Sequence, residues 1–223
     1  MQVDLHSAAS GASARTRIIL LPAAYQATGD LVAEGFIDAV RSRKLPVDIV
    51  IVDLNPLHLA DRSFLARLHA ECIAPARDSG CVSVWLAGIS LGGYLALLYA
   101  AAFPGNVAGL CLLAPYLGNR MITAEISGYD SVERWELSTR MITDMLDEER
   151  RLWRFVARKD SRPMQWYLGF GRQDRYVSAH RLLASQLTAV VVSEIEGAHE
   201  WRVWRQLWCN FLDQFATQLT DCP

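Results

Sequence analysis

The chain has 223 residues, of which 52% are hydrophobic and 21% are charged. This length suits a single domain, and the apolar content is too high for a disordered protein. Lysine and arginine number 22 against 24 acidic residues, so the chain lacks the basic excess that a dedicated nucleic-acid-binding protein needs.

The N-terminal segment 1–16 is expected to be a disordered or extended tail that precedes one domain over 17–219. The first 17 residues have no apolar core of the kind that a signal peptide requires. No stretch approaches the roughly 18 apolar residues of a membrane span. The five cysteines are widely spaced and show no zinc-ligand spacing, which favours free thiols in a reducing, cytoplasmic compartment and predicts no metal site.

Short apolar runs recur along the chain and have the length of β-strands. The six expected strands cover 17–23, 47–54, 82–87, 107–114, 164–170 and 189–195. Their side chains are apolar on both faces, which is typical of strands buried in a parallel sheet.

Helical patterns lie between these runs, over 30–42, 61–77, 91–103 and 200–219. The last of them places Trp201, Trp204 and Trp208 on one apolar stripe, which is typical of core packing. Strands that alternate with helices of these lengths predict a three-layer α/β/α sandwich with a mostly parallel central sheet.

The segment of about 116–163 is too long for an ordinary connection and is expected to form a short helical cap. The alternative is a solvated helix pair that only closes the sheet edge. Trp135 and Trp153 lie on its apolar side, where they belong either to the core or to the wall of an acyl pocket. The charge run 147–151 is expected to be a solvated helix face.

The strongest local signal is the sequence GISLGG over 88–93, directly after an expected strand and before an expected helix. A serine in such a sharp strand-to-helix turn has a strained backbone and an exposed hydroxyl, and the glycines avoid collisions across the turn. Ser90 is therefore the candidate nucleophile.

A serine needs a base, and the base needs an acid to orient it. His199 follows the last expected strand and Asp174 follows the fifth, so both should lie at the same sheet edge as Ser90. His58, after the second strand, is a distant second choice of base. Asp53 and Asp160 are weaker substitutes for the acid.

An acyl-transfer site also needs donors for the oxyanion. We expect the backbone N–H of Leu91, just after the nucleophile, and the N–H of Ala24 in the loop after the first strand, with Tyr25 as an alternative to Ala24. Tyr25, Tyr116 and Leu117 are the expected walls of an apolar substrate pocket.

These segments resemble the α/β-hydrolase superfamily, serine esterase type, over essentially all of 17–219. The matching segments are GISLGG at the elbow, GRQD at the acid, GAH at the histidine and LLPAAY where the family has LLHGxx. GAHEWRVWRQLW also resembles, more narrowly, the G-x-H-x-W-x-x-W signature of esterase D-like esterases. The family's His-Gly is Pro22-Ala23 here, and the late start of the match predicts that outer antiparallel strands of larger members are missing.

The resemblance implies a Ser-His-Asp hydrolase that acts on a small ester or thioester without a cofactor. We expect carboxylic esters of short chain length, cleaved through an acyl-enzyme. A thioesterase or a lactone or peptide hydrolase would share the same motifs. A non-catalytic binding module on the same fold is the alternative from another class, and such a module would normally have a broken triad.

Overall fold

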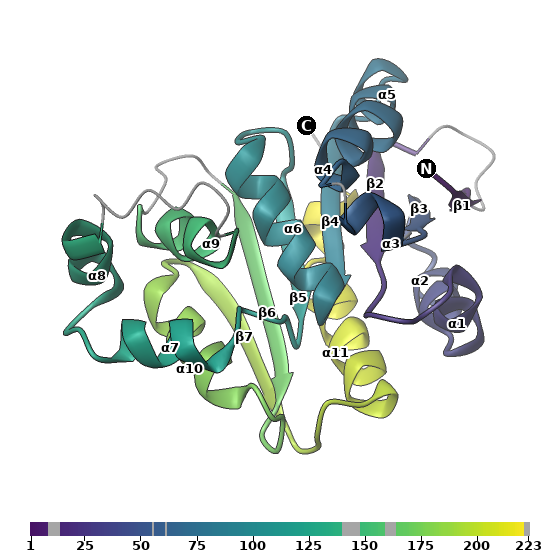
Figure 1. Cartoon of the computed structure of the whole chain (residues 1–223). Helices are drawn as coiled ribbons and strands as arrows, with labels where there is room; N and C mark the ends of the chain where they lie inside the picture. The colour runs from purple at the N-terminus through teal and green to yellow at the C-terminus, as the bar shows by residue number, and fades with distance from the viewer. Residues whose placement is uncertain (9–13, 55, 61, 140–147, 159–163, 221–223) are drawn as a thin grey trace.

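The computed structural model describes residues 1–8, 14–54, 56–60, 62–139, 148–158 and 164–220 (Figure 1). Its centre is a seven-stranded sheet in the order β1-β3-β2-β4-β5-β6-β7. The strands are β1 (Val3–His6), β2 (Thr16–Leu21), β3 (Val47–Val52), β4 (Ser83–Ile89), β5 (Gly109–Leu113), β6 (Gln165–Gly171) and β7 (Val190–Ile195). All six expected strands are present, with ends shifted by only a few residues.

The N-terminal segment, expected to be a disordered or extended tail, contributes the edge strand β1, and residues 9–13 lie outside the described residues. β1 pairs antiparallel with β3, whereas β2 to β7 run parallel to their neighbours. The Arg41 guanidinium donates to the carbonyls of His6 and Ser7, which holds the end of β1 in place. An outer antiparallel strand is therefore present, contrary to the expectation from the late start of the match.

One face of the sheet is covered by helices from the two ends of the domain. These are α1 (Thr28–Ala33), α2 (Phe36–Ser42), α11 (Trp201–Gln214) and α12 (Ala216–Thr220). The sequence predicts one helix over 30–42, but Gly35, with φ of 75°, separates α1 from α2. Trp204 and Trp208 are buried in this layer, as the apolar stripe predicts, whereas Trp201 is only partly buried against it.

The opposite face is covered by α4 (Phe64–Leu68), α5 (Ala74–Asp78), α6 (Leu91–Ala102) and α10 (Val177–Gln186), with the short α3 (Pro56–Ala60) before them. A π-helical turn over His69–Ile73 joins α4 to α5. The expected helix over 61–77 is therefore divided into three segments, and residue 61 lies outside the described residues. α6 lies against β2, β4 and β5.

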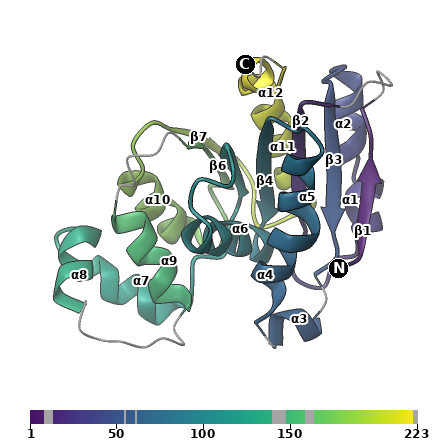
Figure 2. The same cartoon turned by 90° about the horizontal axis from the view of Figure 1, so that it is seen from above.

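The inserted segment holds α7 (Arg120–Ser127), α8 (Val132–Thr139) and α9 (Glu148–Ala157), which group together beside α10 and away from β1 (Figure 2). α9 packs against α6 and α10. Trp135 and Trp153 are fully buried in the core that continues under α6, so they do not wall a pocket. Residue 147 of the charge run lies outside the described residues, and the rest of the run is only partly solvated, because Arg150 forms an ion pair with Glu125.

The parallel strands β2 to β7 bring their carboxyl ends to one edge of the sheet, where the loops that carry the candidate residues begin. Among the described residues, no helix is both long and apolar enough to cross a bilayer. The four cysteines in the described part of the chain are free thiols.

Candidate active site

Ser90 occupies a strained turn between β4 and α6. Its backbone has φ of 50° and ψ of −109°, a conformation that side chains rarely adopt. The Ser90 amide donates to the Leu113 carbonyl of β5 at 3.0 Å, and the Ser90 carbonyl accepts the Tyr116 amide at 2.9 Å. These bonds hold the strained turn against the neighbouring strand, with the side chain directed to the carboxyl edge.

The glycines around Ser90 are required by close backbone contacts. A Cβ on Gly88 would overlap the backbone of Gly92, and a Cβ on Gly92 would overlap the carbonyl oxygen of Leu21. The second contact shows that the loop after β2 passes directly over the start of α6. The expected lack of room for side chains across the turn is therefore confirmed, and the loop after β2 packs against the start of α6.

Three side chains from distant parts of the chain form a continuous hydrogen-bonded series. His199 Nε2 lies 2.9 Å from Ser90 Oγ, and His199 Nδ1 lies 2.7 Å from Asp174 Oδ2. Because a carboxylate only accepts, Nδ1 carries the proton and Nε2 is left to accept the serine hydroxyl. This is the arrangement in which an imidazole can remove a proton from a serine.

The loops that carry Asp174 and His199 are bonded directly to each other. The Gln173 amide donates to the Gly197 carbonyl, and the Gln173 side chain accepts from the Gly197 amide. A Cβ on Gly171 would overlap the Gly197 carbonyl oxygen. Close contact between β6 and β7 at this point fixes the acid and the imidazole relative to each other.

The environment of Asp174 favours its ionised form. Burial alone would raise the pKa of this carboxyl, but the hydrogen bonds from His199 and from the Tyr176 amide outweigh burial and lower it. Asp174 is only 3% exposed. The carboxylate is thus charged near neutral pH and can stabilise an imidazolium at His199.

The sequence offers alternatives to His199 and Asp174: His58 as the base, and Asp53 or Asp160 as the acid. His58 lies on α3, and its side chain is outside the described residues, as is Asp160. The Asp53 amide donates to the carbonyl of Gln2, just before β1. Asp174 is the carboxylate that the structure brings to His199.

The two expected oxyanion amides come from the start of α6 and from the loop after β2. Leu91 begins α6 directly after Ser90, and the backbone of Leu21 and Pro22, which leads to Ala24, lies against Gly92 in the same helix. The Ala23 amide already donates to the Gln26 side chain at 3.0 Å. Within the described residues the amides of Leu91 and Ala24 donate to no acceptor, so both are available to an anion.

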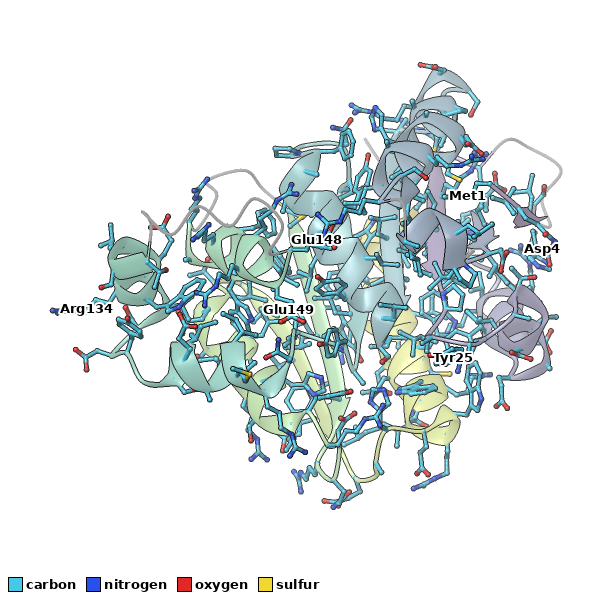
Figure 3. The ribbon with its side chains drawn as sticks, in the orientation of Figure 1. Met1, Asp4, Tyr25, Arg134, Glu148 and Glu149 are labelled. Carbon is cyan, nitrogen blue, oxygen red and sulfur yellow. The ribbon has the colours of Figure 1, made fainter. Side chains whose placement is uncertain are left out.

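The three expected wall residues have different environments. Tyr116 packs edge-on against Tyr94 and Tyr176, and the Tyr176 ring packs edge-on against His199 with centroids 5.4 Å apart. Leu117 is fully buried in the core, contrary to expectation. Tyr25 is fully exposed on the loop after β2, where its φ is 64° (labelled in Figure 3).

Glu149 links the inserted helices to this ring cluster. One carboxylate oxygen accepts the Tyr116 hydroxyl at 2.8 Å, and the other accepts the backbone and side-chain N–H groups of Asn119. Figure 3 shows Glu149 facing the interior of the molecule, whereas Arg134 on α8 projects outward. Burial, followed by the bond to Glu149, raises the pKa of the Tyr116 hydroxyl well above its ordinary value.

Sequence analysis missed several neighbours of the imidazole. Tyr176 follows the acid by two residues, and Trp204 packs edge-on against His199 with centroids 5.0 Å apart. The spacing of Trp204 from the histidine in GAHEWRVW carries a signal: it belongs to the segment that resembles the G-x-H-x-W-x-x-W signature, but that resemblance assigns the tryptophan no contact with the imidazole. Glu149 had no local signal, because its contacts are 30 or more residues away in the chain.

Comparison with known proteins agrees with the fold. The sequence model of the alpha/beta hydrolase family matches residues 18–221. No curated protein is significantly similar to the chain. The structure is similar to Est1E from Butyrivibrio proteoclasticus, with a TM-score of 0.67 and 15% identity over 97% of this chain and 93% of that one.

Two further solved structures show the same fold. One is the S-formylglutathione hydrolase of Staphylococcus aureus, with a TM-score of 0.61 and 13% identity over 90% of this chain and 80% of that one. The other is a carboxylesterase from Nitrososphaera gargenis, with a TM-score of 0.60 and 14% identity over 99% and 95%. At these identities the likeness establishes the fold.

Proposed function

Because the chain belongs to the alpha/beta hydrolase family, we propose that it is a serine hydrolase that cleaves carboxylic esters through an acyl-enzyme. Ser90 is the nucleophile, His199 the general base and acid, and Asp174 the group that orients the imidazole. The observation that carries the proposal is the pair of hydrogen bonds, 2.9 Å and 2.7 Å, that joins these side chains at a strained turn.

In the first half of the reaction, Ser90 Oγ bonds to the ester carbonyl carbon while its proton passes to His199 Nε2. The carbonyl oxygen becomes an anion that the amides of Leu91 and Ala24 can hold. When the tetrahedral intermediate collapses, the carbon–oxygen bond to the alcohol breaks. The alcohol leaves with the proton from His199, and the acyl group stays on Ser90.

In the second half, water takes the place of the alcohol. His199 accepts a proton from water as the water oxygen attacks the acyl carbon, and the same amides hold the second oxyanion. The bond to Ser90 Oγ then breaks, and His199 returns the proton to the serine. Asp174 stays ionised throughout, in agreement with its lowered pKa.

The surroundings of His199 favour a neutral, apolar acyl group of short length. The Tyr176 ring packs against the imidazole and the Tyr116 ring packs against Tyr176. Glu149 adds a carboxylate at the Tyr116 hydroxyl that would repel an anionic acyl chain. We therefore expect p-nitrophenyl esters of short acids to be turned over in preference to esters of dicarboxylic acids.

The test is labelling with a fluorophosphonate, followed by intact-mass measurement. We expect one adduct on the wild-type chain, none on Ser90→Ala, and a normal adduct on Ser127→Ala, which removes an exposed hydroxyl on α7 that bonds only to Thr123. Folded wild-type protein that stays unlabelled would overturn the proposal and favour a non-catalytic binding module.

Substrate panels then separate the hydrolases that share these motifs. Carboxylic esters, thioesters, lactones and peptides should be compared at matched acyl groups with the wild type and Ser90→Ala. We expect the highest kcat/KM for short carboxylic esters. Labelled protein that turns over no ester at any chain length would exclude the esterase assignment while retaining the nucleophile.

A further inference from the structure

A cavity lies at the edge of the sheet opposite the candidate active site. It has a volume of about 360 Å³ and is bordered by the starts of β4, β5 and β6 and by the ends of α6, α9 and α10. Figure 1 shows β4 and β6 running away from this end towards the edge where their arrowheads lie. This volume falls within the roughly 300–1,000 Å³ of small-molecule sites.

The cavity is separate from Ser90. α6 begins at Leu91, beside the nucleophile, and ends at Ala102, beside the cavity. An α-helix rises about 1.5 Å per residue, so its twelve residues span about 18 Å. A small molecule in this cavity would therefore not contact the Ser90 hydroxyl.

The walls of the cavity are mainly apolar. Val84 and Val107 come from the sheet side, Phe155 comes from α9, and Met164 and Trp166 come from the start of β6. Phe155, Met164 and Trp166 are only partly buried, because one side of each packs on the core and the other faces this space. Such walls suit an unbranched hydrocarbon chain.

Arg77 is the one charged residue among the described residues that line the cavity. Its Nη1 donates to Asn106 Oδ1 at 2.8 Å, and the Asn106 amide nitrogen donates to the Phe103 carbonyl. This series fixes the guanidinium, while its Nε and Nη2 groups bond to no described residue. The two groups form the edge that binds a carboxylate with two parallel hydrogen bonds.

We propose that this cavity is a binding site for an amphipathic monocarboxylate, whose carboxylate binds Arg77 and whose medium-length alkyl chain lies against Phe155, Met164 and Trp166. The charge of the ligand matches Arg77, the one cation among the described lining residues, and its chain matches the apolar walls. This site is independent of the proposed esterase activity, since it shares no residue with the candidate active site.

The test uses the full chain with carbon-13-labelled methionine methyl groups, titrated with decanoate and followed by NMR. Met164 lines the cavity, and Met164→Leu assigns its resonance. We expect the Met164 signal to shift saturably with decanoate, and the apparent Kd to be at least tenfold weaker for decanol. Met121, exposed on α7 at the catalytic edge, should keep its position.

Arg77→Met should weaken decanoate binding at least tenfold and leave decanol binding unchanged. Arg134→Met is the matched control, because it removes an exposed arginine on α8 that lies away from the cavity, and it should bind decanoate as the wild type does. The proposal is overturned if the Met164 signal does not shift, if only the Met121 signal shifts, or if Arg77→Met binds decanoate normally.

Discussion

A substitution at Asp174 tests whether Ser90, His199 and Asp174 act together in the reaction. Replacement by asparagine keeps the size of the side chain but lets an amide N–H face His199 Nδ1, which favours the wrong tautomer. We expect Asp174→Asn to lower kcat for a short p-nitrophenyl ester by the order of 10⁴-fold. Steady-state kinetics on protein with wild-type circular dichroism would measure this.

The same variant distinguishes two roles of Asp174: orienting the His199 imidazole, or only holding the structure of its own loop. If Asp174 acted only on the structure of the loop, its bond to the Tyr176 amide would be the important one, and asparagine could retain that bond. Activity within tenfold of wild type would then be observed, and the proposed role of the carboxylate would be wrong.

Among the elements, helix α6 begins at a position where backbone contacts leave no room for a side chain on Gly92. We expect Gly92→Ala to abolish phosphonate labelling and to lower the melting temperature, because a methyl group must displace either α6 or the Leu21 carbonyl. Gly29→Ala in α1 is the matched control, since no atom lies within 4 Å of its added methyl group. Wild-type labelling of Gly92→Ala would contradict this account of the turn.

The inserted helix α9 contacts Tyr116 through the Glu149 carboxylate. Tyr116→Phe removes one hydrogen bond of Glu149, and Glu149→Ala removes its bonds to both Tyr116 and Asn119. Since these residues position a ring beside the site and take no proton in the reaction, we expect KM to rise in that order with kcat changed much less.

Steady-state kinetics on one ester would give kcat and KM separately for Tyr116→Phe, Glu149→Ala and the more conservative Glu149→Gln. Glu149→Gln should lie between the other two, because its carbonyl oxygen can still accept the Tyr116 hydroxyl while its amide cannot accept from Asn119. An equal fall of kcat in all three variants, with KM unchanged, would contradict a positioning role.

For the whole molecule, most of the sheet could be predicted because its strands are buried on both faces and bounded by turns. β1 could not, since its four residues alternate and leave Val3 and Leu5 exposed, a pattern too short to distinguish from a tail. The break at Gly35 was missed because one glycine inside a helical pattern is often tolerated.

In the candidate site, too, some residues could be predicted from the sequence and others could not. Ser90, Asp174 and His199 each follow a strand of the parallel sheet, so the topology alone predicts their common edge. Glu149 and the cavity depend on how helices far apart in sequence pack together, and no local pattern encodes that. The environment of Leu117 likewise depends on α9, whose Trp153 donates to its carbonyl.

His180 links the stability of the whole chain to pH. It is fully buried beneath the site, and its Nε2 lies 2.9 Å from the Pro115 carbonyl, so Nε2 carries the proton of the neutral ring. Burial lowers the pKa of His180 to about 4, despite the attraction of Asp174, while the nearby His199 lowers it slightly further. The unfolded chain has a histidine pKa of about 6.5.

Between these two pKa values the unfolded state binds the extra proton, so protonation pulls the chain towards unfolding. The contribution of neutral His180 is fully present above about pH 6.5 and is lost as the pH falls towards 4, by about 3 kcal/mol in total. His180→Gln keeps a donor for the Pro115 carbonyl but has no titrating group. We expect urea unfolding to show the wild type losing stability relative to this variant across that window, and parallel curves for the two proteins would show that His180 is not the buried neutral group.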